Sequence, residues 1–255
     1  MAFLDMKFYS ESLKRCVSVY VILPEKTKTM IGMDGVATES YKTLWLLHGL
    51  SDDHSIWLRR TSIERYAAER GIAVVMPCVD RSWYTDTAYG AKYFTFITEE
   101  LPRICRNYFR GMSAAREDNL IAGLSMGGYG AVKAALTYPE RYAGCASLSG
   151  AMNIAYFSSN RDKEEWRSIF GYELEDAASL AGTKHDVFYL AEQATAFPRI
   201  FMWCGTEDAL ISHNRDFHQK LTELGVEHEY RESEGNHSWK WWDEHIVSAL
   251  DCLLK

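Results

Sequence analysis

The sequence predicts an α/β fold: a mostly parallel, twisted central sheet with an antiparallel N-terminal hairpin and helices on both faces. Two observations predict it. Short, continuously apolar runs recur along the chain, and segments with apolar residues at helical spacing separate them. No internal repeat, low-complexity tract or Pro/Gly/Ser linker interrupts the 255 residues. We therefore expect one domain, residues 1–255.

The strands follow from two kinds of apolar pattern. Residues 4–9 and 14–23 alternate as half-buried strands and are separated by Ser10, Glu11 and Ser12, which predicts the hairpin. A turn at Asp34 and Gly35 follows it. Buried parallel strands are predicted at the continuous apolar runs 43–47, 72–76, 120–124, 145–148 and 200–204, and a last strand at 226–232.

Helices are predicted between these strands. Apolar residues recur at helical spacing from 94 to 108, and Pro102 should kink that helix or begin a new one, because proline lacks a backbone donor. Further helices are expected at 126–138, 214–224 and 239–253, with Gly225 closing the second of these. Ligands of such sheets bind beyond the carboxyl ends of the strands.

The composition is that of an ordinary soluble globular protein, with 47% hydrophobic and 25% charged residues. There are 28 basic and 35 acidic side chains, a net charge of -7, and no basic run longer than Arg59–Arg60. We therefore expect neither a nucleic acid nor an anionic membrane as a partner.

The chain is expected to be cytoplasmic. Its first ten residues include Asp5 and Lys7 and have no apolar stretch of secretory-signal length, and no window is apolar enough to span a membrane. The six cysteines form no CxxC pair and mostly sit beside apolar residues, so we interpret them as reduced core residues. There is no HExxH and no Cys/His ligand spacing, so no metal or other cofactor is expected.

Residues 121–130 contain the pattern Gly-x-Ser-x-Gly, with Gly123, Ser125 and Gly127 at its fixed positions. The pattern is typical of a nucleophile on a sharp strand-to-helix turn, where side chains at the two glycine positions would collide. The following helix points its N-terminus at the reacting centre, which favours a developing oxyanion. The pattern therefore predicts an α/β-hydrolase fold with Ser125 as nucleophile.

A serine nucleophile needs an imidazole base, which in turn needs a carboxylate. In the α/β-hydrolase arrangement the acid and then the histidine follow the serine along the chain. The loop after the strand at 200–204 offers Asp208, with Glu207 as the alternative, and the loop before the terminal helix offers His237. Two backbone N–H groups should form the oxyanion hole: those of Met126 and of Leu50, with Gly49 allowing a close turn and His48 bracing the loop.

Residues 151–198 are expected to form a small cap-like insertion over the serine. Several aromatic residues could line a pocket beneath it, or could simply pack the cap onto the body. The candidates for substrate binding are Trp57, Trp83, Tyr84, Trp166 and Trp239. Other aromatic residues considered in this role are Tyr89, Tyr156, Phe157, Phe170 and Tyr172.

The chain resembles the bacterial tributyrin-esterase branch of the esterase D family over nearly its whole length. The resemblance is carried by His48-Gly49-Leu50, Trp57, Arg60-Thr61, Glu64-Arg65, the run 82–86, the run 123–130, and His237 with Trp239 and Trp242. It implies hydrolysis of short-chain acyl esters, with a triad of Ser125, Asp208 and His237 and oxyanion donors at Leu50 and Met126. It also suggests a homo-oligomer and a small-molecule ester as substrate.

Relatives of this branch include S-formylglutathione hydrolases, cinnamoyl (feruloyl) esterases, acetyl esterases acting on plant polysaccharide, and mycolyltransferases. Leu50 is followed here by Ser51 and Asp52, where formylglutathione hydrolases tend to have a Thr-Cys pair. The sequence therefore predicts a serine carboxylesterase. Feruloyl or acetyl esterase activity on plant-derived esters and S-formylglutathione hydrolase-like thioesterase activity are alternatives, ahead of an acyltransferase or a non-catalytic binding protein.

Overall fold

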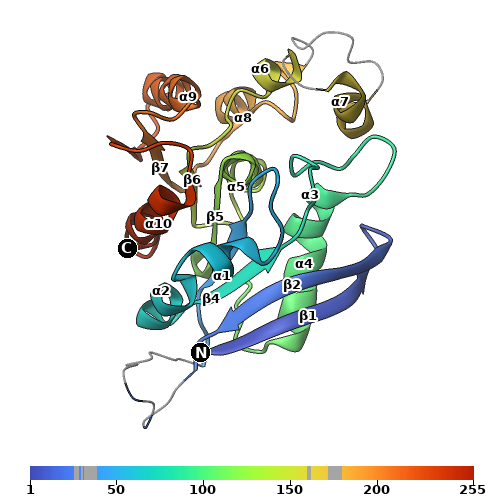
Figure 1. Cartoon of the computed structure of the whole chain (residues 1–255), viewed down its shortest axis with the longest axis vertical. Helices are drawn as coiled ribbons and strands as arrows, with labels where there is room; N and C mark the ends of the chain where they lie inside the picture. The colour runs from blue at the N-terminus through green and yellow to red at the C-terminus, as the bar shows by residue number, and fades with distance from the viewer. Residues whose placement is uncertain (26–28, 30, 32–38, 160–161, 172–179) are drawn as a thin grey trace.

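The computed structural model describes residues 1–25, 29, 31, 39–159, 162–171 and 180–255, which are organised by an eight-stranded sheet (Figure 1). The order across the sheet is β1-β2-β4-β3-β5-β6-β7-β8. Strand β1 pairs antiparallel with β2, and β2 with β4, while every other neighbouring pair is parallel. This confirms the predicted class. The strands are β1 Ala2–Ser10, β2 Arg15–Leu23, β3 Thr43–Leu47, β4 Ala73–Pro77, β5 Asn119–Leu124, β6 Gly144–Leu148, β7 Arg199–Gly205 and β8 His228–Ser233.

The central strands are buried on both faces, which is why their sequences are continuously apolar. Alternate residues of β3 enter different cores: Trp45 belongs to one hydrophobic cluster, and Leu44 and Leu46 belong to the other. Helices α1 (Ile56–Arg60), α2 (Ile63–Arg70) and α10 (Trp239–Leu253) contribute to the second cluster. Helices α4 (Leu101–Tyr108), α5 (Met126–Thr137) and α9 (Ile211–Glu223) contribute to the first.

The helical segment around Pro102 is divided as its sequence requires. Helix α3 (Tyr93–Thr95) is followed by a π-helical turn, η1 (Phe96–Glu100), before α4 begins at Leu101. Pro102 thus lies in the first turn of α4, directly after the π-helical turn. A short 3-10 turn, η2 (Arg116–Asp118), leads into β5.

Helix α9 ends as predicted at Gly225. This glycine has φ 69°, and its N–H donates to the carbonyl of Thr222, while Val226 donates to Leu221. The two bonds close the helix in a Schellman motif and direct the chain into β8. The turn predicted at Asp34 and Gly35 lies outside the described residues.

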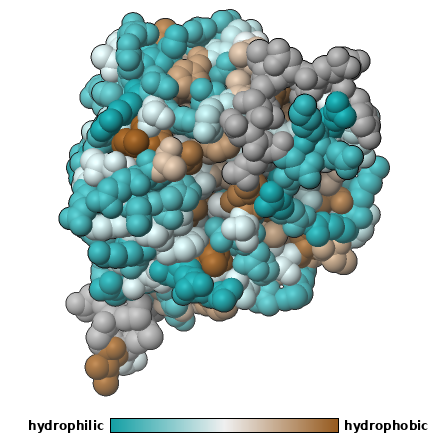
Figure 2. All heavy atoms as spheres, turned by 45° about the horizontal axis from the view of Figure 1, so that its top comes forward, coloured by the Kyte–Doolittle hydropathy of each residue, from teal (hydrophilic) through white to brown (hydrophobic). Residues whose placement is uncertain are grey.

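Among the described residues between β6 and β7, three short helices lie within the predicted insertion: α6 (Ile154–Ser159), α7 (Lys163–Phe170) and α8 (Val187–Gln193). In Figure 1 they gather at the top of the view, at the end of the molecule opposite the N-terminus. Figure 2 brings this end forward and shows a largely hydrophilic surface with small, separate hydrophobic patches. Within the part of the chain that the structure describes, no helix is both long and apolar enough to cross a membrane.

Candidate active site

Ser125 lies on a sharp turn between β5 and α5. Its backbone has φ 53° and ψ −118°, a region that residues other than glycine rarely enter. The turn is held from both sides, because the Ser125 N–H donates to the carbonyl of Leu148 and the Ser125 carbonyl accepts from Ala151. The strained turn lifts the hydroxyl beyond the carboxyl end of the sheet.

The two glycines of the Gly-x-Ser-x-Gly pattern stand where a side chain would collide with backbone. A Cβ on Gly123 would lie 2.4 Å from the carbonyl carbon of Gly127, and a Cβ on Gly127 would lie 2.5 Å from the carbonyl oxygen of Leu47. Neither neighbour can move as a flexible side chain could. Strand β3, strand β5 and helix α5 therefore meet closely only because both positions are glycine.

The imidazole of His237 links Ser125 to Asp208. Its Nε2 lies 3.0 Å from Ser125 Oγ, and its Nδ1 lies 2.8 Å from Asp208 Oδ2. The ionised carboxylate only accepts hydrogen bonds, so Nδ1 carries the proton and Nε2 remains free to accept the serine hydroxyl proton. The structure thus brings together the three residues that the sequence nominated as a triad. Glu207, the alternative acid, is exposed and makes no contact with His237 among the described interactions.

Asp208 is held as an anion. Burial alone would raise its pKa, but hydrogen bonds from His237 and from the N–H of Leu210, which lies 2.8 Å from Oδ1, lower the pKa below its usual value. The carboxylate is therefore ionised where imidazolium must be stabilised.

Backbone bonds join the loop of Asp208 to the loop of His237. Thr206 N–H donates to the carbonyl of Ser233, and Glu207 N–H donates to the carbonyl of Gly235. Gly205 and Gly235 approach so closely that a Cβ on Gly205 would lie 2.1 Å from the Gly235 oxygen. The acid and the base are thus fixed to one another through the main chain as well as through their side chains.

The N–H groups of Leu50 and Met126 point to no acceptor among the described residues. Both residues line the cavity beside Ser125, and Met126 is the first residue of α5, where helical N–H groups have no partner within the helix. Two such donors beside a nucleophile form the arrangement that stabilises an oxyanion.

His48 fixes the peptide that carries the Leu50 N–H. The Val79 N–H donates to His48 Nε2 at 3.0 Å, so Nδ1 carries the proton and donates to the Gly49 carbonyl at 2.7 Å. That carbonyl and the Leu50 N–H belong to the same planar peptide and point in opposite directions. The Tyr84 hydroxyl donates to the His48 carbonyl at 2.8 Å, and burial lowers the pKa of His48, which favours its neutral form.

A small cavity of about 230 Å³ opens beside Ser125 and His237. Its lining is largely apolar and comes from the loops after six strands, β3 to β8, and from α5 and α6: Leu50, Trp83, Ser125, Met126, Ala151, Phe157, Ala209, Leu210 and His237. Sequence reasoning nominated Trp83 and considered Phe157, but it missed Ala151, Ala209 and Leu210. The only feature of the sequence that could have indicated these three residues is their position after predicted strands.

Four of the five nominated substrate-binding residues do not line this cavity, which corrects the expectation for them. Trp57 is buried under the other face of the sheet, and its indole N–H donates to the Leu47 carbonyl. Trp239 packs against Trp57, and Tyr84 is fully buried with its hydroxyl on His48. Trp166 lies behind Trp83, with ring centroids 5.2 Å apart. Tyr172 lies outside the described residues.

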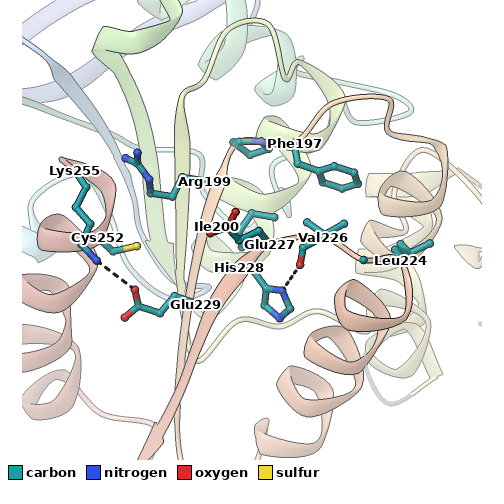
Figure 3. Close-up of a pocket in the computed structure, with 12 residues that line it drawn as sticks. Phe197, Arg199, Ile200, Leu224, Val226, Glu227, His228, Glu229, Cys252 and Lys255 are labelled. Atoms are coloured by element: carbon teal, nitrogen blue, oxygen red, sulfur yellow. Dashed lines mark hydrogen bonds and ion pairs between the residues drawn. The ribbon is translucent and has the colours of Figure 1, made fainter.

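A larger depression of about 780 Å³ lies at the other end of the sheet, between the first residues of β7 and β8, the turn after α9 and the end of α10 (Figure 3). Some of its polar groups are paired within the chain: Lys255 faces Glu229 at 3.8 Å, and the His228 ring bonds the carbonyl of Val226. It lies at the amino ends of parallel strands, away from Ser125. It contains no serine, and we assign it no part in the chemistry.

Comparison with known proteins adds to this geometry. The profile of a family described as "Putative esterase" matches residues 10–253. An acetyl esterase of Caldicellulosiruptor saccharolyticus is 32% identical, over 100% of this chain and 99% of its own. The structure of FphF, a fluorophosphonate-binding serine hydrolase of Staphylococcus aureus, has a TM-score of 0.87 at 34% identity and covers 100% of this chain and 98% of its own. An S-formylglutathione hydrolase structure from the same organism (FrmB) has a TM-score of 0.86 at 33% identity, with 100% and 99% covered.

Proposed function

The chain belongs to the "Putative esterase" family and is a serine hydrolase of carboxylic ester bonds; from this premise we propose that it hydrolyses short-chain acyl esters through Ser125, His237 and Asp208. The observation that carries the proposal is the pair of hydrogen bonds, 3.0 and 2.8 Å long, that joins these three side chains beside a small apolar cavity.

The reaction proceeds by acyl transfer in two steps. Ser125 Oγ attacks the ester carbonyl carbon while His237 Nε2 takes the hydroxyl proton, and Asp208 stabilises the resulting imidazolium. The N–H groups of Leu50 and Met126 hold the negative oxygen of the tetrahedral intermediate. His237 then gives its proton to the leaving alcohol. Water repeats the sequence on the acyl-enzyme, which releases the carboxylic acid and restores Ser125.

The size of the cavity supports a short acyl group. Pockets that enclose drug-sized ligands usually measure about 300 to 1,000 Å³, whereas this one measures about 230 Å³. Trp83 and Phe157 limit it with two rings whose centroids lie 5.1 Å apart. The similarity to an acetyl esterase agrees with a small acyl group.

Residues 151–198 act in this proposal as the cap that sets that limit. Phe157 of α6 reaches the cavity itself, and Trp166 of α7 supports Trp83 from behind. Substituting Phe157 by alanine would lengthen the cavity. We expect the preference of such a variant to move toward longer acyl chains.

Hydrolysis of a thioester is the second candidate. The similarity to an S-formylglutathione hydrolase structure favours it, and the same triad and oxyanion donors would serve a thioester carbonyl. Ser51, which stands where that group of enzymes tends to have threonine, is the feature of the sequence that speaks against it.

The test is a rate comparison on p-nitrophenyl esters from acetate to octanoate, with methyl ferulate and S-formylglutathione added, for the wild type and Ser125→Ala. We expect acetate and butyrate to be the fastest esters, and the variant to be inactive on all. A preference for octanoate or ferulate would refute the short-chain assignment. A faster reaction with S-formylglutathione than with any ester would favour the thioesterase.

We further propose that the protein acts in the cytoplasm as a homo-oligomer on a small-molecule ester. Six cysteines without a disulfide among the described residues are compatible with a reducing compartment. Light scattering coupled to size-exclusion chromatography would measure the oligomeric state, and a monomeric mass would refute that part of the proposal.

A further inference from the structure

His237 lies on an exposed loop, and its own side chain is 36% exposed. A base in such a place can rotate away from the nucleophile unless its ring is held by more than its two catalytic partners. The ring of Trp242, in the second turn of α10, contacts the His237 ring at a centroid distance of 4.8 Å and an angle of 87°. This contact supports the imidazole in addition to its bonds with Ser125 and Asp208.

Trp242 is itself anchored. It is 4% exposed, and its indole N–H donates to Ser149 Oγ at 3.1 Å. Ser149 follows β6, is completely buried, and has φ 50°, a strained value for serine. Its own N–H donates to the Trp203 carbonyl at 2.7 Å, which fixes this residue against β7, the strand that leads to Asp208.

Ser149 thus fixes the indole that contacts His237. Its hydroxyl accepts from the Trp242 N–H, and its own N–H is bonded to β7. Trp242 therefore contacts the His237 ring from a fixed position.

A row of tryptophans continues this support toward the oxyanion loop. Trp242 contacts Trp239 at 5.3 Å, and Trp239 contacts Trp57 at 5.2 Å, each pair nearly perpendicular. Trp57 N–H donates to the carbonyl of Leu47, the residue before His48. Each end of this row is therefore fixed by a hydrogen bond, to Ser149 at one end and to Leu47 at the other.

We propose that Ser149 and Trp242 are positioning residues that hold His237 in line with Ser125 and Asp208. The inference rests on the proposed function, because it assumes that these three residues form the triad. Neither Ser149 nor Trp242 lines the cavity, so their effect falls on proton transfer and not on substrate binding.

The test compares three variants with the wild type on p-nitrophenyl acetate. Ser149→Ala removes the hydroxyl, Ser149→Gly removes it while tolerating the positive φ, and Trp242→Phe keeps a ring against His237 but removes the N–H. We expect each to lower kcat by about tenfold, as a small misalignment of a catalytic group does, with KM nearly unchanged.

The matched control is Ser147→Ala. Ser147 lies two residues earlier, is equally buried, and its hydroxyl has no hydrogen-bond partner among the described residues. Loss of this hydroxyl should leave kcat within about twofold of the wild type. Equal losses in Ser147→Ala and Ser149→Ala would show a general packing effect and overturn the proposal.

A further readout separates positioning from general packing. The Trp242→Phe/Ser149→Ala double variant should lose little more than either single variant, because both remove the same contact. Additive losses would overturn the inference.

Failure of this inference is distinguishable from failure of the proposed function. If Ser125→Ala is inactive while the Ser149 and Trp242 variants match the wild type, the triad holds and the positioning role is wrong. If Ser125→Ala retains activity, the triad itself is wrong.

Discussion

The two halves of the site are held in different ways, although both lie on loops at the carboxyl end of one sheet. On the acid–base half, the proposed base His237 and acid Asp208 contact one another directly through their side chains. On the oxyanion half, the proposed donors are the backbone N–H groups of Leu50 and Met126. Side chains that never meet the substrate, His48 and Tyr84, orient the Leu50 peptide.

This difference decides how each half responds to substitution. Changing a side chain on the acid–base half removes a reacting group or its direct partner. Changing the Leu50 side chain leaves its N–H in place, so the oxyanion half is sensitive mainly to backbone changes and to the residues that brace it. The four predictions below test this contrast in order of decreasing effect.

Asp208→Asn should lower kcat by about 10⁴-fold. The amide can donate to His237 Nδ1, which would place the imidazole proton on Nε2 and leave no acceptor for the Ser125 hydroxyl. The measurement is kcat on p-nitrophenyl acetate beside Glu207→Gln, the neighbouring acid that faces solvent. If kcat falls strongly in Glu207→Gln while Asp208→Asn remains active, Glu207 and not Asp208 is the acid of the triad.

Replacing the Leu50 backbone N–H by an ester oxygen should lower kcat by about 10² to 10³-fold. The side chain is unchanged, so the loss isolates the backbone donor from cavity shape. The control is the wild-type chain made by the same incorporation method with leucine. Full activity in the ester-containing protein would show that Leu50 contributes no oxyanion donor.

His48→Leu should lower kcat between about tenfold and a hundredfold, less than loss of the donor itself. An apolar side chain there removes the bonds to Val79 and to the Gly49 carbonyl, so the Leu50 peptide can rotate. Tyr84→Phe removes the single bond to the His48 carbonyl and should cost about fivefold. A larger fall in kcat for Tyr84→Phe than for His48→Leu would contradict the assignment of His48 as the main support of the Leu50 peptide.

Lys133→Met should give the smallest of these effects, and we expect it in the free energy of unfolding and not in kcat. Lys133 lies beneath the oxyanion half of the site. Burial lowers its pKa from 10.5 to about 7, and its Nζ donates to the Tyr84 carbonyl and to Thr85 Oγ1. Between these pH values the unfolded chain binds more protons at this residue than the folded chain does, so its contribution makes stability rise with pH. Urea unfolding of the wild type and Lys133→Met from pH 7 to 10 should show a steeper rise in the wild type. Parallel curves would contradict the lowered pKa.

The sequence predicted what depends on chain order and on local turns. Gly-x-Ser-x-Gly after an apolar run located Ser125, and the order of the following strands located Asp208 and His237, because in a parallel sheet every such loop emerges at the same edge. The hairpin and Gly225 followed from equally local patterns. These features need little knowledge of distant contacts.

Contacts between distant residues were not predictable in this way. Trp57, Trp83 and Trp239 all present the large aromatic surface that suits either a core or a pocket, and only the packing of α1 and α10 decides that Trp83 alone reaches the cavity. The bond from Trp242 to Ser149 spans 93 positions. Helices α6, α7 and α8 were expected only as an insertion, although Trp166, Ile169 and Phe170 of α7 lie at helical spacing.

The most direct test of the whole account is a rapid-mixing measurement of p-nitrophenolate release from p-nitrophenyl acetate. We predict a burst that approaches one equivalent per active site at high substrate, followed by slower turnover, if deacylation limits the rate, and an acetyl group on Ser125 in the quenched enzyme. Ser125→Ala should show neither. An acetyl group on another residue, or turnover by Ser125→Ala, would contradict the assignment of Ser125 as nucleophile.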